Sequence, residues 1–239
     1  MTRRVHIQKL IAGEVRLPPA QSLHLRDVLR LRTGDWVEAF DDAGASADAE
    51  IVAANVSQVT LSITSIRPPP PTAATWTVAC AVPKGPRADW LVEKLSELGA
   101  TAFIPLITHR SVAAPQGAEK FARWTRLASQ AARQSSRTGV MRIDPLRPLA
   151  DAVAAIAKDS TGWYFSTDPQ ATPITQLVSE NPPPALTMFI GPEGGWTDAE
   201  IELFKAANLT PVRLTSTTLR IETAALTAAA LAATWFDRQ

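Results

Sequence analysis

The residues best suited to chemistry follow a short apolar segment near the C-terminus. Residues 185–190 are apolar enough to form a buried parallel strand. Gly-Pro-Glu-Gly-Gly follows at 191–195, and its glycines allow positive φ and a close approach of the backbone to a ligand. Thr197 and Glu200 have capping-box spacing, so we expect a helix to begin there and run to about Asn208. Ligands bind at the carboxyl ends of strands in open α/β sheets, so this glycine loop is a candidate binding loop. The alternative is a plain turn between a strand and a helix.

A second polar segment follows the next candidate strand. Residues 211–214 form that expected strand, and a run of serine, threonine and leucine follows at 215–219. Arg220 and Glu222 come next, two residues apart, where an alanine-rich helix begins. The glycine loop and this segment are therefore the two parts of the chain that must be positioned together.

Together, the two segments resemble the C-terminal signature of the SPOUT methyltransferases. The resemblance is closest to the family that methylates N3 of a uridine in small-subunit (16S) ribosomal RNA. Residues 191–195 match its glycine loop in full, and residues 219–224 match its Leu-Arg-x-Glu-Thr-Ala motif. Thr215 stands where that family shows glycine, and Thr217 where it shows arginine. The resemblance also extends to Lys84, Asp89 and residues 94–99, and it implies S-adenosylmethionine as the methyl donor.

The resemblance implies the roles of the site residues. Arg220 would stabilise negative charge on the uracil. Glu222 would act as the base, orient Arg220, or cap the last helix near its positive end. The target N3 lies on the Watson–Crick edge, so the uridine must be unpaired or flipped out. The cofactor-binding residues would be Ile190, Gly191, Glu193, Gly194, Gly195, Leu214, Thr218, Leu219 and Thr223.

Composition excludes several classes of protein. The chain has 239 residues, of which 46% are hydrophobic, so it can form a sizeable core. Cys80 is the only cysteine, which excludes an intrachain disulfide and a cysteine-based zinc site, and the three histidines lack metal-ligand spacing. Neither a signal peptide nor a membrane-spanning run is evident. We expect a soluble cytoplasmic protein with no metal and no membrane contact.

The chain is expected to contain two domains. Residues 1–66 show several short alternating strands and one helix near 22–30, with Ser22 as its N-cap, which favours a small β-barrel. Four prolines at 68–71 suggest a stiff spacer, so we place domains at 1–70 and 73–239. The first domain resembles the PUA-like barrel of the same family, which implies RNA binding. Its candidate contacts are Arg26, Arg30 and Arg32, although these also suit a solvated helix face.

From residue 73 strands and helices alternate, which predicts a parallel sheet covered by helices on both faces. Physical principles alone favour an unknotted doubly wound fold. The resemblance implies instead a C-terminal trefoil knot that builds the cofactor site. The expected fold class is therefore α/β, with a SPOUT trefoil-knotted parallel sheet preceded by a small PUA-like β-barrel.

A predicted helix at 119–137 has two opposite faces. One face carries Phe121, Trp124 and small residues, and the other carries arginines. Residues 109–147 contain eight basic and two acidic side chains, a concentration that the overall net charge of +1 hides. Such a patch suits ribosomal RNA, and we expect the assembled small subunit to be the substrate; a solubilising face is the alternative. The candidate RNA-binding residues are Arg123, Arg126, Arg133 and Arg137.

The last helix, at 223–236, is rich in alanine, which permits close packing. The resemblance implies a homodimer with this region at the interface; a helix buried within one subunit is the alternative.

Three other functions are considered. A nicotinamide-dependent oxidoreductase would show Gly-x-Gly-x-x-Gly after its first strand, but residues 83–87 read Pro-Lys-Gly-Pro-Arg. A non-catalytic RNA-binding assembly factor would keep the arginine face without needing the glycine loop. A SPOUT methyltransferase for another RNA nucleotide would share both features.

Overall fold

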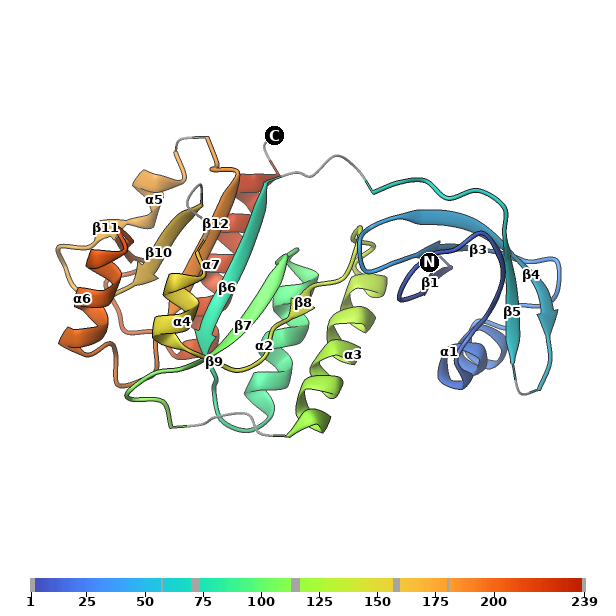
Figure 1. The fold of residues 1–239 in the computed structure, drawn as a ribbon, viewed down its shortest axis with the longest axis horizontal. Coiled ribbons are helices and arrows are strands. Elements are labelled where there is room, and N and C mark those ends of the chain that lie inside the picture. Colours follow the sequence, from blue (N-terminus) through green and yellow to red (C-terminus); the bar gives the residue numbers. More distant parts are fainter. Residues whose placement is uncertain are drawn as a thin grey trace. The chain divides into compact units, whose positions relative to one another are not determined.

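Contacts divide the chain into two units in the computed structural model, which describes residues 3–56, 58–69, 74–112, 117–156, 160–179 and 181–237 (Figure 1). The first unit comprises Met1–Thr72 with Ala132–Val140, and the second comprises Ala73–Ala131 with Met141–Gln239. No pattern in the sequence indicated that Ala132–Val140 joins the first unit, because that segment follows the predicted helix directly.

The second unit is built on a parallel sheet in the order β11-β13-β10-β12-β6-β7-β8, with β9 also pairing with β7. Strands β12 and β13 fall within one residue of the predicted ranges 185–190 and 211–214. The shortest ones, β8, β9 and β11, were not predicted, because two residues show no periodicity. The strands are β6 (Thr75–Ala81), β7 (Ala102–Ile107), β8 (Arg142–Ile143), β9 (Arg147–Pro148), β10 (Thr161–Phe165), β11 (Thr172–Pro173), β12 (Ala185–Ile190) and β13 (Thr210–Arg213).

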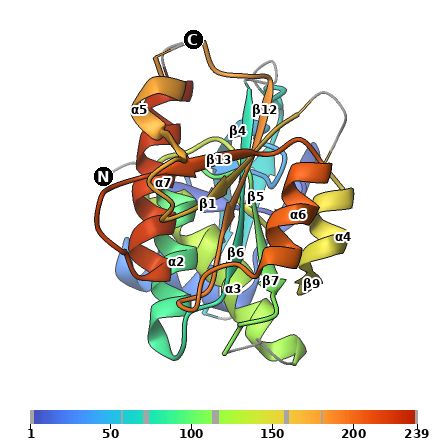
Figure 2. The ribbon, with the colours of Figure 1, turned by 90° about the vertical axis from the view of Figure 1, so that its left-hand side faces the viewer.

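Helices cover both faces of this sheet. Figure 2 shows α2 and α7 on one face, and α4 and α6 on the other. On the second face Tyr164 of β10 stacks on Phe204 of α6, with ring centroids 4.5 Å apart. Two covered faces are what a buried parallel sheet requires, so the predicted α/β class is confirmed. The helices are α2 (Pro86–Glu97), α3 (Ala118–Gln134), α4 (Leu149–Ala154), α5 (Ile174–Leu177), α6 (Asp198–Ala206) and α7 (Ile221–Phe236).

The centre of the apolar stripe predicted for α3 is buried. Trp124 and Ala128 have no exposed surface, and the Trp124 ring meets Phe103 of β7 edge-on at 5.7 Å. The predicted end of this helix was wrong. It ends at Gln134 rather than at residue 137, and Ser136 adopts a left-handed conformation with φ of 59°. Because the helix ends early, the arginine at 137 lies outside the predicted stripe.

Asp89 joins α2 to α3. Its Oδ1 accepts hydrogen bonds from Lys120 Nζ at 2.7 Å and Trp124 Nε1 at 2.8 Å, and its Oδ2 accepts one from Arg123 Nε at 2.7 Å. Burial raises the pKa of the Asp89 carboxyl, but the three donors outweigh burial, so the pKa lies below its ordinary value. The stabilisation is therefore present above the ordinary value of about 3.9, and it is lost as the pH falls through the lowered pKa.

Asp89→Asn is expected to lower the free energy of unfolding at neutral pH by about 1–3 kcal/mol, because it weakens a set of charge-assisted hydrogen bonds. The difference from the unaltered protein should shrink in acid, where Asp89 itself becomes protonated. Urea unfolding followed by tryptophan fluorescence at both pH values measures this. Glu202→Gln is the control, since it breaks only an exposed ion pair with Lys205. Equal effects of the two substitutions would contradict the prediction.

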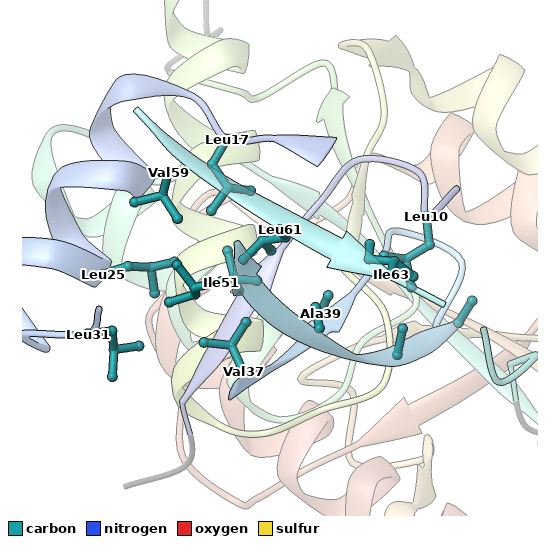
Figure 3. Close-up of a cluster of buried hydrophobic side chains, with 14 residues drawn as sticks. Leu10, Leu17, Leu25, Leu31, Val37, Ala39, Ile51, Val59, Leu61 and Ile63 are labelled. Atoms are coloured by element: carbon teal, nitrogen blue, oxygen red, sulfur yellow. The ribbon is translucent and has the colours of Figure 1, made fainter. Parts of the chain in front are cut away.

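The first unit holds a five-stranded mixed sheet in the order β1-β3-β4-β5-β2, in which β1 and β3 are parallel and the other pairs antiparallel. Every second residue of β5 (Val59–Ile63), namely Val59, Leu61 and Ile63, points into one core, shown in Figure 3. This sheet is consistent with the predicted barrel-like domain. Its other strands are β1 (Arg4–His6), β2 (Gly13–Arg16), β3 (Trp36–Phe40) and β4 (Ser46–Ala54).

The predicted helix at 22–30 was wrong in its start and its geometry. It begins earlier, at a proline that is preorganised for the first helical position, and it continues as a π-helix. Ser22 is not its N-cap. The buried Ser22 hydroxyl donates to the Leu17 carbonyl at 3.2 Å and accepts from the Val59 N–H at 3.0 Å. The two elements are α1 (Pro19–Leu23) and η1 (His24–Val28).

Candidate functional site

A cavity of about 640 Å³ lies at the carboxyl ends of three adjacent strands. Segment 165–169 follows β10, segment 190–196 includes the end of β12 and the glycine loop, and segment 214–219 follows β13; together they supply most of its walls. Strand β10 lies between β12 and β13, so the order of the sheet brings the three segments together. The volume is typical of a site for a small ligand or cofactor.

The glycine loop is held against the end of β10 by Trp196. Its indole Nε1 donates to the Phe165 carbonyl at 2.8 Å. The ring lies so close to the loop that a Cβ on Gly191 would be 2.9 Å from Trp196 Cε2, which no real side chain tolerates. Gly195 has φ of 69°, a conformation that glycine adopts without strain. Two of the three glycines are thus required for different reasons, close packing and backbone conformation.

The loop that follows β7 braces the other side of the glycine loop. Arg110 NH1 donates to the Gly194 carbonyl at 2.6 Å and to the Trp196 carbonyl at 3.3 Å. Glu200 Oε1 accepts from the His109 N–H at 2.9 Å. Glu200 Oε2 accepts from the Thr197 N–H at 2.8 Å and completes the predicted capping box at the start of α6. The sequence predicted the capping box, but it did not predict the contact between Glu200 and the His109 N–H.

Most of the residues predicted to hold a cofactor line this cavity. Eight of the nine do so; the exception is Thr223, which is exposed on α7. The prediction missed Arg110 and segment 165–169. Segment 165–169 lies at the carboxyl end of β10, and the rule that ligands bind at the carboxyl ends of strands is the signal that could have found it. No local signal marks Arg110.

The predicted catalytic pair lies at the N-terminus of α7. Arg220 is the exposed N-cap residue, and its carbonyl accepts from the Ala224 N–H at 2.9 Å. Glu222 is buried, and its Oε1 accepts from Arg87 NH1 on α2 at 3.1 Å. Its Oε2 is also buried, with no hydrogen-bond partner in the described part of the chain. Ile221 and Ala224 line the cavity, but Arg220 and Glu222 do not, so the pair stands beside the cavity.

The pKa of the Cys80 thiol, near the end of β6, is affected by the acidic side chains of this region. Burial raises the pKa of its thiol, and the negative charges of Glu222 and Glu193 raise it further. The thiol is therefore protonated and unreactive, which excludes Cys80 as a nucleophile.

The three candidate RNA-binding arginines of the first unit differ in what they already contact. Arg26 donates to Asp27 Oδ1 at 2.6 Å, to the Asn55 carbonyl at 3.0 Å, and to the Val56 carbonyl. The remaining two, Arg30 and Arg32, are exposed. Arg30 has φ of 56° and follows η1, so the alternative of a solvated helix face does not apply to it.

The four candidate arginines of the long helix differ in the same way. Arg123 pairs with an acid on α2, as described above, whereas Arg126 is exposed. Arg133 is half-buried, and its charge adds to burial in lowering the pKa of His24. Burial lowers the pKa of the Arg137 guanidinium to about 10. Of the four, Arg126 is therefore the one that is exposed and in no ion pair within the described ranges.

Two features are absent from the described ranges. No group of three or more histidine, cysteine, aspartate or glutamate side chains is arranged to hold a metal ion. No helix within those ranges is both long and apolar enough to cross a bilayer.

Residues 70–233 match the model of the RNA methyltransferase domain family, and together with the parallel sheet and its cavity this makes the chain a member of the RNA methyltransferases. The chain is 33% identical over 223 residues to ribosomal RNA small subunit methyltransferase E of Synechocystis, covering 91% of this chain and 72% of that protein. It is 30% identical to the Bacillus subtilis protein of the same name, covering 85% and 83%. Within the RNA methyltransferases, it belongs to the ribosomal RNA small subunit methyltransferase E family.

Solved structures show the same fold. Ribosomal RNA small subunit methyltransferase E of Neisseria gonorrhoeae, bound to S-adenosylmethionine, superposes with a TM-score of 0.86 at 26% identity over 98% of both chains. A methyltransferase from Legionella pneumophila, also with S-adenosylmethionine, gives a TM-score of 0.84 at 27% identity over 98% of both chains. The family favours the methyltransferase over the oxidoreductase and the non-catalytic alternatives.

Proposed function

We propose that this protein transfers the methyl group of S-adenosylmethionine to N3 of a specific uridine in 16S ribosomal RNA. The observation that carries the proposal is the cavity, which unites the two segments of the family signature at the ends of β12 and β13. The Neisseria gonorrhoeae relative, which covers nearly the whole chain, binds the same cofactor.

The residues around the cavity fit this cofactor. Its volume is sufficient for a nucleoside carrying an amino-acid chain, and the glycine loop exposes backbone groups to it. Asp168 and Glu193 line the cavity. Their carboxylates suit a molecule that bears a cationic sulfonium and an ammonium group.

The chain's own residues must align the uridine and favour its anionic form. S-adenosylmethionine supplies a methyl group on a sulfonium, which an in-line nucleophile accepts. Alignment of two reactants contributes about 7–11 kcal/mol to such a step. Arg220, exposed beside the cavity, stabilises the negative charge that develops on the uracil as the N3 proton is lost to solvent water. The uridine must be unpaired or flipped out to reach it.

We assign Glu222 an anchoring role rather than the role of the base. Its Oε1 is held by Arg87 and its Oε2 is buried, so neither oxygen is open to a substrate in this conformation. The pairing joins the first turns of α2 and α7, and a negative charge is favourable near both helix N-termini. It thereby fixes the start of α7, where Arg220 lies.

Glu222→Gln is accordingly expected to retain turnover within about threefold at saturating cofactor, because removal of a true base would cost about 10²–10⁴-fold. It should lower the melting temperature, since the charge-assisted bond to Arg87 is weakened. Steady-state methyl transfer and thermal unfolding measure the two effects. Arg87→Lys serves as the control that keeps the ion pair. A loss of more than a hundredfold in kcat with normal folding would restore Glu222 as the base.

The RNA contacts follow from which cations are accessible. We propose that Arg126 and Arg133 with Arg30 and Arg32 hold RNA phosphates, because the other candidates are engaged within the chain or buried. We also propose a cytoplasmic homodimer that acts on the assembled small subunit, and a trefoil knot in the C-terminal region, as the family resemblance implies. Sedimentation velocity tests the dimer.

The decisive experiment is methyl transfer from labelled S-adenosylmethionine to small ribosomal subunits from cells that lack this gene, with the product nucleoside identified by mass spectrometry. We expect 3-methyluridine. Subunits from cells that retain the gene are the matched control and should accept no label. A different methylated nucleoside would change the assigned specificity. Absence of both transfer and cofactor binding would overturn the proposal in favour of an RNA-binding factor.

A further inference from the structure

Arg110 is a cation in the cavity wall to which the proposed reaction assigns no role. It lies in the loop after β7, is exposed, and lines the cavity beside the glycine loop. Asp168 and Glu193, the acids of the cavity wall, belong to other loops, after β10 and β12. Arg110 is therefore a positive charge at the edge of a site whose acidic groups suit a cationic cofactor.

The guanidinium of Arg110 is fixed in place. Its NH1 donates to the carbonyls of Gly194 and Trp196, and its aliphatic chain lies flat on Gly194, where an added Cβ would be 3.1 Å from Arg110 Cδ. A group held in this way loses little side-chain entropy when it binds a ligand.

The same guanidinium keeps donors to spare. In the described ranges no hydrogen bond uses its Nε or NH2, and no carboxylate lies within 4.0 Å of it, whereas Arg87, Arg123 and Arg142 each pair with an acid. A fixed arginine with a free edge and no counter-charge matches the geometry of an oxyanion that accepts two parallel hydrogen bonds.

We propose that Arg110 binds a backbone phosphate of the substrate RNA next to the target uridine, at the mouth of the cavity. The inference rests on the proposed function and adds the residue that connects the cofactor loop to the RNA. Charge favours an anion, because Arg110 is an exposed cation with no counter-charge in the described ranges. The Arg110 side chain would thus contact the RNA phosphate and the glycine loop at the same time.

The test is Arg110→Gln in the full-length protein. The glutamine amide is able to donate to the Gly194 carbonyl, so that hydrogen bond is kept. The positive charge and the paired guanidinium donors are lost. We expect the KM for small subunits that lack the modification to rise about tenfold, with kcat and the Kd for S-adenosylmethionine changed less than about twofold. The slope of log binding constant against log salt should become shallower by about 0.7, the loss of one phosphate contact.

Arg142→Gln is the matched control, since Arg142 is an exposed arginine of the same basic segment that pairs with Asp144 and does not line the cavity. It should leave the KM unchanged. A rise in the Kd for S-adenosylmethionine with unchanged RNA binding would assign Arg110 to the cofactor carboxylate and overturn the proposal. If neither RNA binding nor the Kd for S-adenosylmethionine changed, Arg110 would serve only to hold the glycine loop, and the proposal would also be overturned. Failure of the proposed function is distinguishable, because the unaltered protein would then transfer no methyl group.

Discussion

Arg220→Ala is expected to lower kcat for methyl transfer by about 10²–10³-fold, the usual cost of removing a group that stabilises charge in a transition state. Arg220 precedes α7 beside the cavity and makes no side-chain cap to the helix, so its removal should not unfold the protein. Single-turnover transfer of a labelled methyl group to unmodified small subunits measures the effect. The Kd for S-adenosylmethionine should stay the same, because Arg220 does not line the cavity.

Arg220→Lys provides the matched control for that experiment. It keeps the charge but loses the planar fork, so we expect an intermediate kcat. Replacement of Arg220 should change kcat more than KM, since the charge on the uracil develops only as the proton leaves. If the alanine variant retained turnover within threefold, the assignment of Arg220 to the reaction would be wrong.

Gly191→Ala is expected to weaken binding of S-adenosylmethionine by about 5- to 150-fold. Its Cβ would lie 2.9 Å from the Trp196 ring, so either the loop or the indole must move. Overpacking of this kind costs about 1–3 kcal/mol, and the strain falls on the segment that lines the cavity. Titration calorimetry with S-adenosylmethionine measures the loss.

Two further variants show whether the contact with Trp196 is the cause. Gly85→Ala strains a positive φ of 67° in open space and outside the cavity, and it should leave the cofactor Kd unchanged. Trp196→Phe removes part of the ring that the new Cβ meets, so the double variant should bind better than the sum of the two single effects predicts. Strict additivity would show that the loss has another origin.

Local signals in the sequence determined the part of the site that a single segment builds. The apolar run of β12, the glycines after it and the capping box at Thr197 and Glu200 lie within a stretch of sixteen residues, so neighbouring residues alone specify them. For the same reason the alternation of strands and helices was sufficient to predict a parallel sheet covered on both faces. The match of two segments to a known signature then identified eight residues that line one cavity.

Only the tertiary structure decided how that site is held together. Arg110 and Gly194 are 84 residues apart, Phe165 and Trp196 are 31 apart, and Arg87 and Glu222 are 135 apart. These contacts form only when segments far apart in the sequence come together in the folded sheet. The local periodicity of the sequence does not predict such contacts. Long-range contacts also placed Ala132–Val140 in the first unit. The sequence therefore specified which segments carry the chemistry, and long-range packing decided which side chains brace them and which remain free to bind.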